Sequence, residues 1–314
     1  MSSTQMIRRL SIVTPLYNEQ ENVTELCDRV AAVMQTLPYE YEHLCIDNCS
    51  TDRTVEMLRS RASTDPSLRI IVNTRNFGYI RSSYHGLLQA TGDAAVLIAS
   101  DLQDPPEIIR EFVEKWEAGF KTVMAVKPMS DESLIMFRLR KLYYRMITKI
   151  SEVPLVQNAT GSGLFDRAVI DILGQLDDPY PYFRGLVCEI GFPIATVPFK
   201  QPRRVRGVTS QNFYSLYDTA MLGITKHSKV PLRLMTIMGF GLAFVSLVIA
   251  CCYFVAKLLF WQSFEIGTAP LLIGLFFFGA VQMIFLGLLG EYIGAIQTQV
   301  RKLPLVVEAE RINF

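Results

Sequence analysis

The sequence is poor in residues that bind transition metals and lacks the spacings that such sites use. Its three histidines are scattered along the chain, which argues against a zinc site: His43, His85 and His227. The six cysteines form no CxxC pair and show no metal-site spacing: Cys27, Cys45, Cys49, Cys188, Cys251 and Cys252. We therefore expect six free thiols in a reducing compartment.

Other signatures are also missing. The 31 basic and 30 acidic side chains leave a net charge of +1, which suggests neither a nucleic-acid-binding protein nor an acidic tail. The chain has no GxGxxG and no GxxxxGK[ST] motif, so neither a dinucleotide fingerprint nor a P-loop is available. The N-terminus, MSSTQMIRRLSIVTPLYNE, has too short an apolar core for a signal peptide. We expect the first part of the chain to stay in the cytoplasm.

Two long apolar runs in the last third of the chain account for much of a hydrophobic fraction of 50%. Residues Leu234–Ala256 and Ile266–Gly290 contain no charged side chain. A helix of about 20 apolar residues spans the hydrocarbon core of a bilayer. The runs therefore predict two transmembrane helices, with two buried core helices as the alternative.

Basic side chains flank the two runs on their outer sides. Lys226, Lys229 and Arg233 precede the first run, and Arg301 and Lys302 follow the second. By the positive-inside rule, both ends of the chain face the cytoplasm. The expected location is the cytoplasmic (inner) membrane, which the chain crosses twice.

This topology divides the chain into four parts. They are a cytoplasmic domain (1–210), an amphipathic juxtamembrane segment (211–233), a two-helix transmembrane anchor (234–294) and a cytoplasmic tail (295–314). The juxtamembrane segment would lie along the membrane surface and hold the active site near the headgroups. Small residues in the second run, within GLLGEYIG, would allow helices to pack into a homo-oligomer.

Strand-like and helix-like patterns alternate in the first part of the chain. Four segments are strand-like: LSIVTPLY, EHLCIDN, RIIVN and AAVLIAS. Three helical patterns separate them: QENVTELCDRVAAVMQTL, DRTVEMLRSRAS and YIRSSYHGLLQAT. Such alternation predicts βαβ units and a mostly parallel sheet, in which ligands bind at the carboxyl ends of the strands. A polar cluster follows each of the four strands, so we expect one site at that edge.

Five segments, in chain order, carry a specific resemblance: TPLYNEQENV, IDNCSTDRT, RNFG, SDLQDPPEII and GLLGEYIGAIQTQV. Together with the two apolar runs, they resemble the polyprenyl-phosphate glycosyltransferases, the dolichyl-phosphate-mannose-synthase-like branch of glycosyltransferase family 2. The similarity extends from Leu10 to about Pro304. It implies a nucleotide-diphospho-sugar transferase fold of type A, which is α/β and Rossmann-like with a mostly parallel sheet. Two transmembrane helices follow that fold.

The resemblance also implies a reaction. A sugar would pass with inversion from a nucleotide-sugar, with UDP as the expected nucleotide, to undecaprenyl or dolichyl phosphate for cell-envelope glycans. The implied partners are this donor, the polyprenyl phosphate and membrane lipid, with no nucleic acid. A processive polysaccharide synthase is disfavoured because the QxxRW motif is absent. A catalytically impaired, membrane-anchored sugar-nucleotide-binding or assembly protein stays open, because Ala99 and Ser162 depart from the family pattern.

Asp101 and Gln103 are the candidate metal ligands. Two residues apart in an extended segment, they would project to the same side. Oxygen ligands suit Mg²⁺ or Mn²⁺, which would neutralise the leaving diphosphate. In relatives the corresponding aspartate and glutamine approach the metal, and a further aspartate stands where this chain has Ala99. Alternatively, Asp101 and Asp104 cap the helix starting at Pro105, and Asp104 is expected as its cap in either case.

The family pattern also suggests residues for the nucleotide-sugar site. They are carried over from the strand ends: Pro15, Tyr17, Glu19, Asp47, Asn48, Arg75 and Asp101. Relatives usually have an aspartate at Asn48 that contacts the nucleobase. Asparagine offers both a hydrogen-bond donor and an acceptor, so it can still form hydrogen bonds with the edge of a uracil base. Alternatively, Asp47 and Asn48 only form a turn.

Asp101 and Ser162 are the candidate catalytic positions. Ser162, in NATGSGLFDR, stands where relatives carry the aspartate proposed as general base. A lipid phosphate is largely dianionic at neutral pH, so it needs no base, but it needs basic side chains to bind it. The candidate acceptor-phosphate residues are Arg138, Arg203, Arg204 and Arg206. Alternatively, these basic side chains bind anionic lipid headgroups without specificity.

Overall fold

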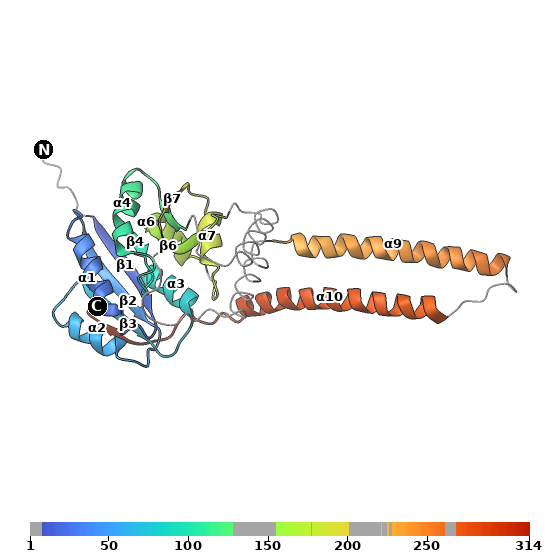
Figure 1. Ribbon diagram of the computed structural model, residues 1–314, viewed down its shortest axis with the longest axis horizontal. Coiled ribbons are helices and arrows are strands. Elements are labelled where there is room, and N and C mark those ends of the chain that lie inside the picture. Colours follow the sequence, from blue (N-terminus) through green and yellow to red (C-terminus); the bar gives the residue numbers. More distant parts are fainter. Residues whose placement is uncertain are drawn as a thin grey trace.

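The computed structural model describes residues 8–127, 155–176, 178–200, 221, 225, 228–260 and 268–314. An α/β domain carries a long helical hairpin that projects from one side (Figure 1). The described part of the domain contains one eight-stranded sheet. Its strands are β1 (Arg9–Leu16), β2 (Glu40–Asp47), β3 (Leu68–Asn73), β4 (Ala94–Leu97), β5 (Thr122–Val126), β6 (Ala159–Asp166), β7 (Ile194–Pro198) and β8 (Glu308–Ile312).

The strand order is β7-β5-β6-β4-β1-β2-β3-β8. Strand β1 pairs in parallel with β2 and β4, and β2 pairs in parallel with β3. Strand β5 also pairs in parallel with β7, whereas β6 and β8 run antiparallel to their neighbours. The predicted mostly parallel sheet is confirmed, with antiparallel strands at β6 and at the β8 edge.

Helices cover both faces of the sheet, and the first three are the predicted ones. They are α1 (Val23–Met34), α2 (Thr54–Ala62), α3 (Tyr79–Gln89), α4 (Ile109–Glu117), α6 (Arg167–Gly174) and α7 (Phe183–Glu189). In β1, Leu10 and Ile12 pack with residues of α1 and α4, whereas Val13 packs with residues of α3, α6 and α7. Because both faces are buried, the strands read as nearly continuous apolar runs.

The hairpin consists of α9 (Val230–Leu259) and α10 (Thr268–Val300). Both helices are long and apolar enough to cross a membrane. Their large side chains are exposed; Phe240 and Phe276, for example, are each 74% accessible. The alternative of two buried core helices is therefore wrong. At the base of the hairpin, Tyr292 Oη donates a hydrogen bond to the carbonyl of Ser228 at 2.8 Å.

The end of the chain returns to the α/β domain. Residues Glu308–Ile312 form β8 and pair antiparallel with β3, whereas the sequence analysis treats 295–314 as a tail. Asn313 Nδ2 donates to the carbonyls of Ala62 and Leu68 at 2.8 and 3.0 Å. The strand escapes the sequence pattern because it lies at an edge, where charged residues alternate with partly buried ones.

Candidate active site

Hydrogen bonds join the two loops that follow β1 and β2. Asn18 N donates to Ser50 Oγ at 2.8 Å, and Glu19 N donates to Thr54 Oγ1 at 2.9 Å. Asn18 is in the left-handed region at φ 55°, which asparagine tolerates better than most residues. The loops therefore form one polar rim at the carboxyl ends of the parallel strands.

The predicted donor-site residues of the first loop lie in different environments. Pro15 is buried within β1, whereas the side chain of Tyr17 is 44% exposed. Glu19 Oε2 accepts from Asn22 Nδ2 at 2.7 Å, and Glu19 Oε1 accepts from Ser100 Oγ at 3.2 Å. Glu19 thus joins the loop after β1 to the loop after β4, and Tyr17 presents its ring to solvent.

Asp47 ends β2 and is fully buried. Its Oδ2 accepts from Ser50 N at 2.9 Å, which is the turn role that the sequence suggests. Its Oδ1 is buried without a hydrogen-bond partner among the described residues. Burial raises the pKa of Asp47, although the hydrogen bonds from Ser50 partly oppose this shift. A buried carboxylate oxygen without a partner destabilises the charged form unless a ligand supplies a donor or a cation.

The side chain of Asn48 organises the loop after β3. Asn48 Oδ1 accepts from Phe77 N at 2.9 Å and from Asn73 Nδ2 at 3.2 Å. Asn48 Nδ2 donates to Asn76 Oδ1 at 2.7 Å, and that oxygen also accepts from Gly78 N at 2.8 Å. The amide of Asn48 is therefore mostly used inside the protein. The NTRNFG loop owes its shape to this network.

Arg75 lies on the outer side of that loop. Its guanidinium carbon is 3.9 Å from the centre of the Phe77 ring, and Nη1 donates to the carbonyl of Asn76 at 3.2 Å. The side chain is exposed. Stacking on Phe77 limits the positions that this cation can take while leaving its charge accessible to an anion.

Asp101 follows β4 and is partly exposed. Its Oδ1 accepts from Gln103 N at 3.2 Å, and its Oδ2 has no hydrogen-bond partner among the described residues. Leu102 is in the left-handed region at φ 57°, so the segment turns sharply. The expectation of an extended segment is therefore wrong, and alternation along a strand does not place Asp101 and Gln103 on one side.

The sequence predicts that Asp104 caps the helix after it, and this prediction is wrong. The turn η1 (Pro106–Ile108) has Pro105 at its cap position and no side-chain cap. Asp104 is instead buried, and Asp104 Oδ2 accepts a hydrogen bond from Ser162 Oγ at 2.5 Å. Burial raises the pKa of Asp104, while the hydrogen bonds from Ser162 and Thr160 oppose this shift. The loop after β4 and strand β6 thus meet at the carboxylate of Asp104.

Two further polar residues complete this part of the site, and sequence reasoning missed both. Arg184 Nη2, from α7, donates to the carbonyl of Thr160 at 2.6 Å. Tyr79, the first residue of α3, interacts electrostatically with Asp104, Arg184 and Asp101. No motif spacing signals Arg184, because α7 reaches the site only through the fold. Tyr79 directly follows the RNFG motif, and this position was the only sequence feature that could have indicated a role in the site.

The structure brings together most of the predicted donor and metal residues at one edge of the sheet. The loops that carry Glu19, Asp47 and Asn48 are hydrogen-bonded to one another or to the loop before Asp101. The predicted acceptor-phosphate residues lie outside the described residues: Arg138, Arg203, Arg204 and Arg206.

A family model described as "Glycosyl transferase family 2" matches residues 11–171. The chain belongs to glycosyltransferase family 2. The match covers β1 to β6, which includes the strand ends that carry Asp47, Asp101 and Ser162. The enzyme is thus a glycosyltransferase, and the family resemblance found in the sequence is confirmed.

Similar proteins extend beyond the matched domain. The glycosyltransferase is 32% identical over 306 residues to an uncharacterized glycosyltransferase of Synechocystis sp., covering 97% of this chain and 96% of the relative. It is also 32% identical over 297 residues to a prophage-derived bactoprenol glucosyl transferase of Shigella flexneri, covering 94% and 96%. A mannosyltransferase of Pyrobaculum calidifontis, solved with GDP-Man and Mn²⁺, superposes with a TM-score of 0.47 at 17% identity, covering 94% of this chain and 88% of that one.

Proposed function

We propose that this glycosyltransferase moves a sugar from a nucleotide-sugar to a polyprenyl phosphate at the cytoplasmic face of the membrane. One structural observation carries the proposal. Helix α7 supplies Arg184 to the site and also borders a cleft of about 210 Å³ with the end of α10. Arg184 thus lies on a helix that reaches the base of an apolar hairpin, where a lipid phosphate would present its headgroup. The bactoprenol glucosyl transferases among the relatives support the same acceptor class.

We propose that the donor is UDP-linked and sits on the polar rim. Asp47 Oδ1 is buried without a partner among the described residues, so it would accept from an N–H of uracil only if donor binding opens the loop after β2. Asn48 would act less directly, because its amide holds the NTRNFG loop in place. Arg75 would approach the diphosphate from the edge of that loop, where its guanidinium is accessible.

The partly exposed carboxylate of Asp101 fits a hard divalent cation, Mg²⁺ or Mn²⁺. Its Oδ2 has no hydrogen-bond partner among the described residues, and the backbone N–H of Gln103 holds Oδ1 in one orientation. Gln103 would contribute its amide oxygen from the same turn. When bound, such an ion neutralises the charge that develops on the leaving diphosphate. Ala99 supplies no ligand, so Asp101 is the chief protein contact.

The acceptor step needs no general base from the protein. Ser162 Oγ donates a hydrogen bond to Asp104 Oδ2, so its hydroxyl is held as a donor at this position. A phosphate monoester dianion attacks the anomeric carbon without losing a proton, and the nucleoside diphosphate leaves from the opposite face. This geometry gives inversion. Arg203, Arg204 and Arg206, with Arg138, would hold the acceptor phosphate through guanidinium pairs.

The experiment is a donor panel. Full-length enzyme in detergent receives undecaprenyl phosphate, a divalent cation and one nucleotide-sugar at a time, and the organic-extractable product is identified by mass. We expect one lipid-phosphate-sugar product, formed from a UDP-sugar. A parallel assay with the Arg203→Gln, Arg204→Gln and Arg206→Gln triple variant should weaken acceptor use while leaving nucleotide binding nearly unchanged.

Two outcomes would overturn parts of the proposal. Binding of a nucleotide-sugar without any lipid product would favour the alternative, an impaired sugar-nucleotide-binding or assembly protein, for which Ala99 and Ser162 are the motivating departures. An equal loss of nucleotide affinity in the triple variant would assign the arginines to the donor site or to the fold.

A further inference from the structure

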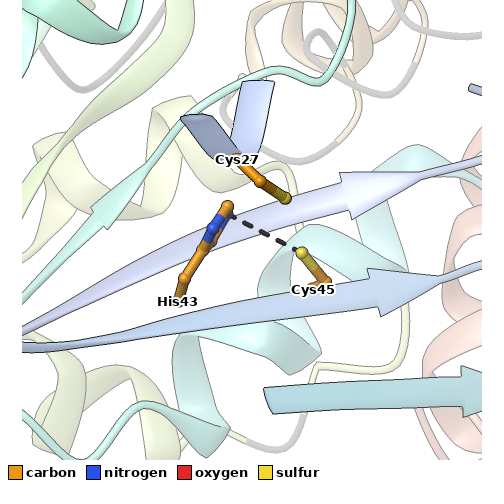
Figure 2. Close-up of side chains that lie close together, drawn as sticks. All are labelled: Cys27, His43 and Cys45. Atoms are coloured by element: carbon orange, nitrogen blue, oxygen red, sulfur yellow. Dashed lines mark hydrogen bonds between the residues drawn. The ribbon is translucent and has the colours of Figure 1, made fainter. Parts of the chain in front are cut away.

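Three potential metal ligands lie together in the core, outside the residues assigned to the donor site. Cys27 comes from α1, and His43 and Cys45 come from β2 (Figure 2). One ligand atom from each residue lies within 4.8 Å of the other two. The sequence argues against a zinc site, because its histidines are scattered and its cysteines form no CxxC pair. The fold brings the helix and the strand together and removes that objection.

One of the three ligand pairs already has a spacing close to that of a metal centre. Cys45 Sγ lies 3.7 Å from His43 Nε2. Tetrahedral coordination with metal–sulfur bonds of about 2.3 Å and metal–nitrogen bonds of about 2.0 Å places S and N about 3.6 Å apart. His43 and Cys45, both in β2, therefore already have this spacing. Cys27 faces them from α1 (Figure 2).

The surroundings favour a cation over an empty cluster. The exposed fractions of Cys27, His43 and Cys45 are 3%, 3% and 0%, and the two thiols belong to an apolar cluster that includes Leu16 and Leu58. A thiolate isolated among apolar side chains is costly, whereas a bound cation offsets its charge.

We propose that Cys27, His43 and Cys45 supply three of the ligands of one soft d¹⁰ cation, Zn²⁺ or Cu⁺, at an internal structural site. Thiolate and imidazole are the ligands that these ions prefer. His43 Nε2 lies 3.0 Å from Thr14 Oγ1, so metal binding exchanges this hydrogen bond for a coordination bond. All three ligands are buried, so the ion would enter during folding.

The site would couple α1 to β2 directly beneath the polar rim. Cys45 stands two residues before Asp47, and α1 begins four residues after Glu19. A metal at this point would therefore fix the starting positions of both donor-site loops without contacting the substrate.

The test measures metal in full-length enzyme that is expressed with added zinc or copper and purified without chelators. Mass-spectrometric metal analysis should find about one ion per chain. Cys27→Ser and Cys45→Ser should each lose most of it, whereas Cys188→Ser, a matched buried cysteine outside the cluster, should retain it. Expression with Co²⁺ should give thiolate-to-cobalt absorption in the near ultraviolet that disappears in the same two variants.

A second measurement covers variants that fail to fold. Denaturing wild-type enzyme in the presence of a chromogenic chelator should release the same quantity of metal. Wild-type enzyme with less than about a tenth of an ion per chain after both supplements would overturn the proposal. So would metal that persists in both cysteine variants.

Discussion

Ser162 Oγ donates a hydrogen bond to Asp104 Oδ2 at 2.5 Å and so joins β6 to the loop after β4. Both side chains are buried. Gly163 follows the serine, and a Cβ at that position would lie 2.3 Å from the carbonyl of Val123. Strand β6 therefore approaches β5 closely at the residue that follows this serine.

Ser162→Ala should reduce stability more clearly than turnover. The alanine leaves a buried carboxylate oxygen of Asp104 without its hydroxyl donor, which commonly costs about 1–3 kcal/mol in the free energy of unfolding. Turnover should fall about tenfold or less, because a phosphate dianion needs no base. Thermal unfolding and initial rates on the same preparation test both expectations. A variant as inactive as one lacking Asp101 would show that the serine takes part in the chemistry.

Asp101→Asn should abolish metal-dependent donor binding and lower turnover strongly. Loss of one preorganised charge-stabilising group commonly costs about 10²–10³ in rate, and the chief metal ligand should cost at least that. Calorimetric titration with a nucleotide-sugar, with and without Mn²⁺, measures the first effect. Asp171→Asn, which changes an exposed carboxylate on α6, is the matched control. Full activity in Asp101→Asn would show that Asp101 is not a metal ligand.

The Asn48 network predicts a contrast between two equivalent substitutions. Asn48→Asp removes the donor to Asn76 and sets two oxygens against each other, so we expect weaker donor binding and a loss of about 1–3 kcal/mol in stability. Asn76→Asp keeps an acceptor for both of its recorded donors, Asn48 Nδ2 and Gly78 N, and should be mild. Equal effects of the two variants on nucleotide affinity would show that the network does not shape the loop.

Stability should decline in mild acid through His85. His85 Nε2 lies 2.6 Å from Glu308 Oε1, where α3 meets β8. Burial lowers the pKa of His85, with Glu308 opposing the shift, so the unfolded chain binds the proton more readily than the folded one. The stability present above the ordinary pKa of about 6.5 should be lost as pH falls below it.

Unfolding midpoints measured between about pH 7.5 and 5 check this expectation. His85→Gln should flatten the curve, and Glu308→Gln should deepen the decline because it removes the partner that favours the charged imidazole. Parallel curves for wild type and His85→Gln would assign the pH dependence to other groups.

The pairing of β8 with β3 predicts that both ends of the hairpin lie on one side of the membrane. In a Cys251→Ala, Cys252→Ala background, Phe264→Cys should react with an impermeant maleimide added outside intact cells. Phe314→Cys should react only after permeabilisation, as the positive-inside rule requires. Labelling of Phe314→Cys from outside would reverse the assigned orientation.

Local patterns predicted the first half of the domain well. Strands β1 to β4 and helices α1 to α3 follow from apolar periodicity, and the site edge follows from the polar residues after each strand. The side-chain partners were not predictable in this way. Ser162 is 58 residues from Asp104, and both are polar residues inside the core, so hydropathy indicates neither their burial nor their contact. Strand β8 was missed because its pairing partner, β3, precedes it by more than 200 residues.

The place of β8 has a consequence for biosynthesis. The ribosome makes β3 early, yet its outer edge stays unpaired until the last residues of the chain have emerged. During that interval, the exposed edge can pair with other chains. If α9 and α10 cross the membrane as we propose, β8 can reach β3 only when the two helices turn back to the same side of the bilayer. On that topology, the native sheet would be completed only in correctly inserted molecules, and incompletely inserted chains would keep an open edge at β3 that proteases and chaperones could recognise.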